Sequence, residues 1–98
     1  MYDDPWVRWN DETYMGGPYG LRAWLAFARS KNKRLCIGEW GVGNYGDNAD
    51  FVQKMHDFVT FAQGTGSFDH EAYWNRSWAR LYPTTSVPKA AARYRELF

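Results

Sequence analysis

The chain has 98 residues, with 45% hydrophobic and 19% aromatic content, and its formal net charge is +1. A chain of this length forms one small domain that buries roughly 60–65% of its unfolded surface. The apolar content excludes an intrinsically disordered chain, and the near-zero charge gives no field that would attract nucleic acid or a membrane surface. We therefore expect a single globular domain over residues 1–98 that binds neither nucleic acid nor membranes.

The first segment of the chain has no regular pattern, and the second has the pattern of a helix. Residues 1–17 mix Asp, Asn, Gly and Pro with aromatic residues, which predicts an irregular leading segment. From Pro18 to about Lys33, apolar residues recur at the i, i+3, i+4, i+7 spacing of one helix face. Pro is favoured at the first helical position, so we expect this helix to begin at Pro18. The residues of the apolar face are Leu21, Trp24, Leu25 and Ala28.

The segment from Leu35 to Trp40 is a short apolar run without the alternation of a surface strand, which predicts a buried parallel strand. Cys36, the single cysteine, cannot form an intrachain disulfide and is expected to be a small buried hydrophobic residue. If Leu35, Ile37 and Glu39 share one face, the first two fill the interior and Glu39 emerges at the C-terminal end of the strand. In β/α enzymes this end of the sheet carries the chemistry.

A glycine-containing loop over residues 41–48 separates this strand from a second helix, which is expected over about residues 49–63. Asp47 or Asn48 is expected to cap this helix, because short polar side chains accept hydrogen bonds from the first free amides. Residues 64–66 end the helix. Its apolar stripe consists of Phe51, Met55, Phe58, Val59 and Ala62.

The remaining sequence predicts a second strand, an irregular stretch and a terminal helix. Within the strand, His70, Ala72 and Trp74 alternate on one face. The indole of Trp74 is therefore expected at the same end of the sheet as Glu39. The ranges are residues 68–75 for the strand, 76–87 for the irregular stretch and 88–98 for the helix, which Pro88 opens.

The order of these elements, which is helix, strand, helix, strand, helix, predicts an α/β fold. A strand–helix–strand connection of this length implies a parallel, right-handed crossover, the repeating unit of a β/α barrel. We expect a partial (β/α)8 barrel, roughly a quarter of one, with two β/α units and a C-terminal helix over residues 18–98. Two parallel strands leave two open sheet edges, so we expect a homo-oligomer, in which four copies would supply eight strands.

Glu39 is the main candidate for chemistry. A carboxylate at a strand end beside an aromatic ring suits sugar chemistry, because the carboxylate can attack an oxocarbenium-like centre and a flat ring can stack on a pyranose. Trp40 and Trp74 are the candidate sugar platforms, and an oligo- or polysaccharide is the expected partner. The alternative is structural: Glu39 is then a surface carboxylate at a strand end, or one that pairs with Arg34 or Arg76, and Trp74 fills the core.

Other kinds of site have little support in the sequence. Residues 41–46 match the G-x-G-x-x-G spacing of dinucleotide-binding loops. However, the helix cap follows the third glycine, and Glu39 and Asp47 bring negative charge to the place of a pyrophosphate. No metal-ligand spacing occurs either, so we expect neither a cofactor nor a metal ion. Residues 1–5 lack the pattern of a secretory signal, and the compartment stays open.

Five segments carry a resemblance to a known family: residues 37–43 (IGEWGVG), 46–48 (GDN), 51–57 (FVQKMHD), 72–75 (AYWN) and 88–98 (PKAAARYRELF). Together they resemble the C-terminal part of family 26 glycoside hydrolases. These in turn resemble the wider retaining β/α-barrel clan that includes β-mannanases and endoglucanases. The similarity runs from about Pro18 to Phe98, and the Gly-Glu-Trp-Gly run is its most specific part.

The resemblance implies roles for individual residues. Glu39 matches the nucleophile at the end of the family's seventh strand, and Trp74 matches an aromatic residue at the end of the eighth strand that lines the sugar subsite. Tyr2 corresponds to a tyrosine that hydrogen-bonds the nucleophile, and Tyr45 is a further candidate for substrate binding. The implied activity is retaining hydrolysis of β-mannan or β-glucan, in a family whose members are often secreted.

One requirement of that chemistry is missing. The family's acid/base glutamate lies on the fourth strand, for which this chain has no counterpart. Retaining hydrolysis needs two carboxyl groups about 5–5.5 Å apart, and Glu71 has the wrong strand parity to face Glu39. Four further carboxylates, Asp3, Asp4, Asp11 and Glu12, lie on the leading segment, whose path the sequence does not determine. A second copy can also bring a carboxylate across an interface, and we expect the chain to act as an oligomer. The alternative is a non-catalytic chain that binds saccharide or self-assembles.

Overall fold

The structure is a computed structural model, and it describes residues 20–43 and 46–98. The predicted order of helices and strands is confirmed over this part of the chain. Pro18, where the first helix is predicted to begin, and the predicted irregular segment 1–17 lie outside the described residues. The elements are α1 (Leu21–Ser30), β1 (Leu35–Trp40), α2 (Ala49–Gly64), β2 (Phe68–Tyr73), the short 3-10 helix η1 (Ser77–Ala79) and α3 (Pro88–Leu97).

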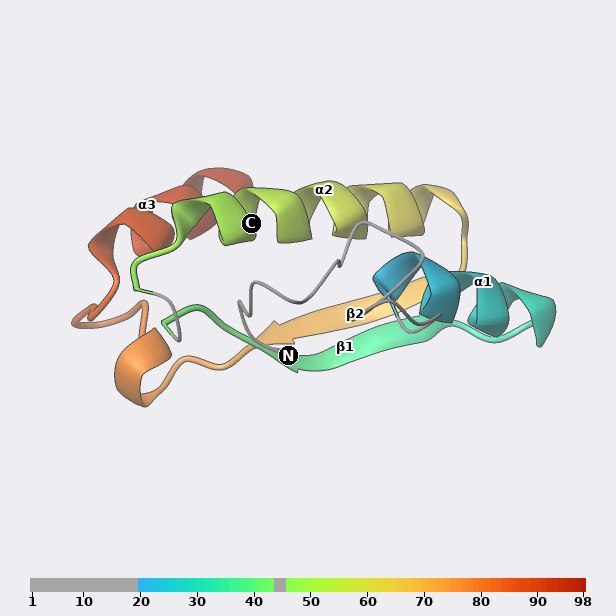
Figure 1. The fold of residues 1–98 in the computed structure, drawn as a ribbon, viewed down its shortest axis with the longest axis horizontal. Helices are drawn as coiled ribbons and strands as arrows, with labels where there is room; N and C mark the ends of the chain where they lie inside the picture. The colour runs from blue at the N-terminus through green and yellow to red at the C-terminus, as the bar shows by residue number, and fades with distance from the viewer. Residues whose placement is uncertain (1–19, 44–45) are drawn as a thin grey trace.

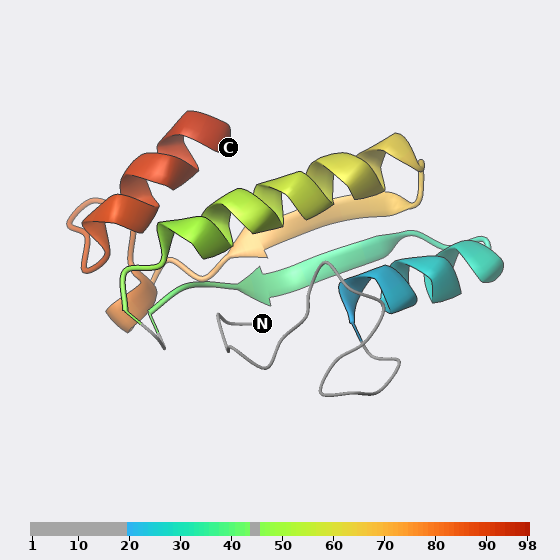
Figure 2. The ribbon, with the colours of Figure 1, turned by 45° about the horizontal axis from the view of Figure 1, so that its top comes forward.

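The two strands lie side by side and run in parallel, with α2 connecting them. Helices α2 and α3 lie together on one side of the strands (Figure 1). Helix α1 lies beside β1, away from β2 (Figure 2). This arrangement confirms the α/β class and the parallel strand–helix–strand connection.

Helix α2 forms as its sequence pattern predicts. The side chain of Asn48 caps it by accepting a hydrogen bond from the amide of Phe51, at 3.0 Å. Burial of each large apolar side chain stabilises the fold by about 1.5–3 kcal/mol, so the apolar stripe is what holds α2 on the sheet. Val52 is buried, and so are all the predicted residues of the stripe, which are Phe51, Met55, Phe58, Val59 and Ala62.

The pairing of the strands is irregular. The register pairs Leu35 with Phe68, Ile37 with Glu71 and Trp40 with Tyr73, with a shift between each pair and the next. Ile37 fills the core as predicted. Because of the second shift, residue 40 also turns into the core, so simple alternation does not hold to the end of β1.

Trp40 lies at the centre of the core and is 0% exposed. Its ring stands edge-on to that of Tyr73, with ring centroids 4.9 Å apart. Its indole N–H donates a hydrogen bond to the carboxylate of Glu71, at 2.6 Å, so the one polar atom of this buried ring has a partner. Rings from both covering helices and the chain end surround it, with centroids 5.7–6.1 Å away: Phe51, Tyr94 and Phe98.

Two predictions about burial are wrong. Cys36 is exposed, because it lies on β1 next to Ile37, which takes the core-facing position. Trp24 is 48% exposed, although it was assigned to the buried face of the first helix together with Leu25, which is 3% exposed. Helix α1 lies beside β1 rather than across the sheet, so only a narrow stripe of it reaches the core.

Helix α3 begins at Pro88, as predicted, but its cap comes from a distant residue. The carboxylate of Asp47 accepts hydrogen bonds from the backbone amides of Lys89 and Ala90, both at 2.7 Å. Asp47 was one of two candidates to cap α2, a role that Asn48 fills. The loop after β1 is therefore joined to the last helix of the described chain.

Candidate functional site

Glu39 lies at the C-terminal end of β1 and is exposed. The side chain that follows it, Trp40, is buried, so the strand separates an exposed carboxylate from the aromatic core within one residue. This placement agrees with the predicted emergence of Glu39 at the strand end. It gives the carboxylate access to a ligand from solution.

The other described carboxylates are held in different places. Asp47 binds the amides of α3, Glu71 binds the indole of Trp40, and Asp69 binds Arg34 and His70. The others lie on helices: Asp50 and Asp57 on α2, and Glu96 on α3. Within residues 20–43 and 46–98, these hydrogen bonds and ion pairs hold the strand and loop carboxylates on groups other than Glu39.

The predicted sugar platforms lie in different environments. Trp40 is fully covered by the core and presents no surface to a sugar. Trp74 is half-buried, and its backbone amide donates to the carbonyl of Trp40 at 2.7 Å, which places it beside the end of β1. The indole N–H of Trp74 is buried without a hydrogen-bond partner. Tyr2 and Tyr45 lie outside the described residues.

The loop that follows Glu39 depends on one glycine. Gly43 has φ +122°, a conformation that residues with a side chain rarely adopt. A Cβ atom at this position would clash with the ring of Trp78 and lie 2.9 Å from the Trp78 carbonyl oxygen. This close approach gives the glycine a structural role and brings η1 against the loop.

A cavity of about 900 Å³ lies between the end of β2, the segment after it and α3. Sequence reasoning missed this site. The i, i+4 spacing of Tyr94 and Phe98 on the last helix was the available signal, because it places two rings on one helix face. The lining residues are Tyr73, Asn75, Leu81, Tyr82, Pro83, Ala91, Tyr94, Arg95 and Phe98.

Tyr94 gives the cavity one of its walls. Its ring stacks on that of Phe98, with centroids 4.7 Å apart and an angle of 14° between the planes. Burial, and to a smaller extent the negative charge of Glu71, raise the pKa of Tyr94 above its ordinary value. The phenol therefore keeps its proton and remains a hydrogen-bond donor over the whole neutral range.

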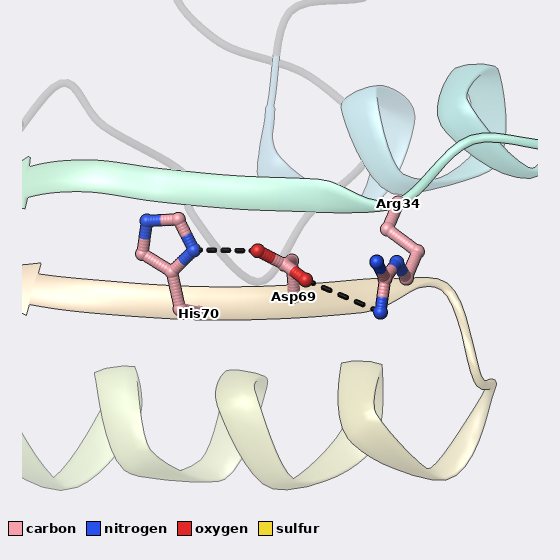
Figure 3. A network of polar contacts seen from close by, with 3 residues as sticks. All are labelled: Arg34, Asp69 and His70. Atoms are coloured by element: carbon pink, nitrogen blue, oxygen red, sulfur yellow. Dashed lines mark hydrogen bonds and ion pairs between the residues drawn. The ribbon is translucent and has the colours of Figure 1, made fainter.

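A polar network of Arg34, Asp69 and His70 lies near the start of the two strands (Figure 3). Asp69 accepts from His70 Nδ1 at 2.7 Å and pairs with Arg34 at 3.2 Å. The hydrogen bond from His70, and secondarily the Arg34 charge, lower the pKa of Asp69. All of these side chains are exposed, so the network is a surface feature near the start of the strands.

In the part of the chain that the structure describes, no group of His, Cys, Asp and Glu side chains is able to hold a metal ion. No helix in that part has the length and apolar character that crossing a membrane requires.

Comparison of the chain with protein-family models, with curated proteins and with solved structures gave no match. A function for this protein has to come from its own residues. Those residues offer two places for a ligand, which are the exposed carboxylate of Glu39 and the aromatic cavity beside α3.

Proposed function

We propose that the chain is a glycoside hydrolase-like quarter of a (β/α)8 barrel that acts on β-linked glycosides of the β-mannan or β-glucan type. Glu39 is the nucleophile of a retaining mechanism. Its carboxylate attacks the anomeric carbon while the C–O bond to the leaving group breaks and a second carboxyl group protonates the leaving oxygen. Water, deprotonated by that second group, then hydrolyses the glycosyl ester and releases Glu39. The observation that carries the proposal is an exposed carboxylate at the C-terminal end of a parallel strand, where β/α enzymes hold their reacting groups.

The second carboxyl group of the mechanism comes from another copy of the chain. Asp47, Asp69 and Glu71 are bound to other groups, so none of them serves as the proton donor to Glu39. In the described part of the chain each strand has a single neighbour, and another copy would extend the sheet. The proposed active form is therefore a homo-oligomer.

The proposal is tested by comparing the wild type with Glu39→Ala. The substrates are β-mannan, β-glucan and activated aryl β-glycosides, and the rate of hydrolysis is measured. We expect the variant to lose turnover on every substrate that the wild type cleaves. Azide should restore release of the aryl group from the variant, because a small anion can replace a missing nucleophile but cannot repair a fold. Glu96→Ala, which removes an exposed carboxylate of α3, is the matched control and should behave as the wild type.

The oligomer leaves a separate signature. Specific activity should fall on dilution and recover on concentration, since a site shared by two copies disappears when they separate. Equal rates for the wild type and Glu39→Ala would remove Glu39 from the mechanism. Activity that is independent of protein concentration would remove the second copy.

The second candidate is a non-catalytic chain that binds saccharide. It is favoured because the described carboxylates on the strands and the loop are bound to other groups and do not serve as a general acid. Loss of general acid assistance typically costs on the order of 10²–10⁴-fold in rate. Activated aryl glycosides need that assistance least. Cleavage of aryl glycosides alone would indicate an incomplete catalytic site, whereas sugar binding with no cleavage of any substrate would favour the binding function.

A further inference from the structure

The cavity beside α3 has the properties of a ligand site that is separate from Glu39. Its volume of about 900 Å³ falls within the range of pockets that bind small molecules. Tyr73, one of its lining residues, packs against Trp40 in the core, so the cavity opens on the side of the sheet that the helices cover. The site therefore needs no contribution from the exposed carboxylate at the end of β1.

The cavity is built before any ligand arrives. Asn75 holds the segment that carries Tyr82: its side-chain amide donates to the Tyr82 carbonyl at 2.8 Å, and its oxygen accepts from the amides of Leu81 and Tyr82 at 2.6 and 3.1 Å. The hydroxyl of Tyr73 donates to the carbonyl of Ala79 at 2.7 Å and fixes the floor. A wall held in this way loses little entropy on binding.

Aromatic rings and polar groups both line the cavity. Tyr94 and Phe98 stack on each other on the α3 side, and Tyr82, with 76% of its surface exposed, stands on the other side. Arg95 also lines the cavity. Among the described residues Arg95 has no acidic partner, whereas its neighbour Arg93 pairs with Glu96. The guanidinium and the phenols therefore remain available to a ligand.

We propose that this cavity binds a pyranose ring of an oligosaccharide. A pyranose has an apolar face of C–H groups and a rim of hydroxyl groups, which matches a lining that combines aromatic rings with phenol and guanidinium groups. The sugar ring stacks on the Tyr94–Phe98 pair and is covered by Tyr82. Arg95 donates hydrogen bonds to the hydroxyl oxygens of the sugar.

Titration of the full chain with β-1,4-linked mannopentaose and cellopentaose tests this site. Calorimetry and NMR of the aromatic ring protons measure the binding. We expect Tyr82→Ala to raise the dissociation constant roughly fivefold to tenfold, through loss of one stacked ring. Arg95→Gln should raise it by about tenfold, because hydrogen bonds from a charged donor are stronger than neutral ones. Both side chains are exposed, so neither change should alter the unfolding midpoint.

Two controls separate this site from the proposed catalytic one. Phe27→Ala removes an exposed ring on α1, outside the cavity, and should bind the sugars as the wild type does. Adding Tyr82→Ala to Glu39→Ala should weaken sugar binding by the same factor as adding it to the wild type, because the ring acts at a site separate from Glu39. Sugar binding that depends on Tyr82 would support this site even if no substrate were cleaved, in which case only the enzymatic proposal would fall.

The cavity proposal is overturned by either of two results. One is that neither pentasaccharide binds the wild type at millimolar concentration. The other is that they bind, but Tyr82→Ala and Arg95→Gln bind them as tightly as the wild type. Hydrolysis that persists in that second case would leave the function of Glu39 intact.

Discussion

At Gly43 the backbone adopts a conformation that a side chain would oppose, and the neighbouring residue leaves no room for one. We expect Gly43→Ala to lower the free energy of unfolding by about 1–3 kcal/mol, through strain at positive φ and the clash with Trp78. Denaturant unfolding measures the change. Gly38→Ala is the control, because a Cβ at Gly38 would meet no atom within 4 Å. Equal midpoints for the two variants would contradict the account of this loop.

The free energy of unfolding depends on pH in the acid range because of the Asp69 carboxylate. Its pKa is lowered in the folded chain, first by the hydrogen bond from His70 and then by Arg34. The stabilisation is present above the unfolded pKa of about 3.8 and is lost as the pH falls through the lower, folded value. We expect Asp69→Asn to unfold with a weaker pH dependence than the wild type as the pH falls through and below about 3.8. The effect is small because the group is exposed, and identical pH profiles would refute it.

The sequence predicted single residues well only where their role depended on local position. Glu39 was assigned to an exposed strand end from its place in an apolar run, and it lies there. The burial of Trp40 and the exposure of Cys36 depend on which side of the sheet the helices cover and on shifts in strand register. Those shifts involve β2, more than 25 residues further along the chain, so no pattern within β1 could predict them.

At the level of elements, one side chain joins the loop after β1 to α3. Asp47 accepts hydrogen bonds from two amides at the start of α3, where the preceding residue, Val87, provides no cap. We expect Asp47→Ala to lower the free energy of unfolding by about 1–2 kcal/mol, the range of a lost helix cap. Thermal or denaturant unfolding measures it.

The control for this change is Asp57→Ala, which removes an exposed carboxylate that accepts a hydrogen bond from Gln53 on the same helix. It should cost less than about 0.5 kcal/mol. Hydrogen exchange adds a local measurement, since the amides of Lys89 and Ala90 should lose protection in Asp47→Ala and keep it in Asp57→Ala. Retained protection in both variants would show that Asp47 does not hold α3.

Helices and strands were the most predictable part of this protein. Helix α2 has a continuous apolar stripe and a capping Asn48, and both its type and its bounds were predicted closely. The bond from Asp47 to α3 was missed, because the sequence alone does not indicate which of two adjacent polar residues caps a helix that starts some 40 residues later. The aromatic cavity was missed for a similar reason, since its walls come from β2, the segment after it and α3.

For the whole molecule, the two-stranded sheet determines how copies would meet. If copies close the sheet into a barrel, the exposed face that carries Ala72 becomes the barrel interior, and a charge placed there would be expensive to bury. We expect Ala72→Lys to shift the mass in solution towards the 11.5 kDa of one chain without lowering the stability of that chain. Analytical ultracentrifugation over a range of concentrations measures the mass.

Ala92→Lys introduces the same charge on the exposed side of α3 and should leave the mass of the assembly unchanged. Loss of assembly in both variants would indicate a general effect of charge. A wild type that sediments as a single chain at every concentration would rule out the shared active site. In that case the binding function, which needs only one copy, would be the one to pursue.

The indole of Trp74 has a thermodynamic consequence for the end of the sheet that carries Glu39. A hydrogen-bond donor that is withdrawn from water and left without an acceptor costs about 1–3 kcal/mol. That is a large share of the stability of so short a polypeptide. The missing hydrogen bond therefore raises the free energy of the folded chain at this end of the sheet. A ligand oxygen that accepted a hydrogen bond from the indole nitrogen would recover that free energy.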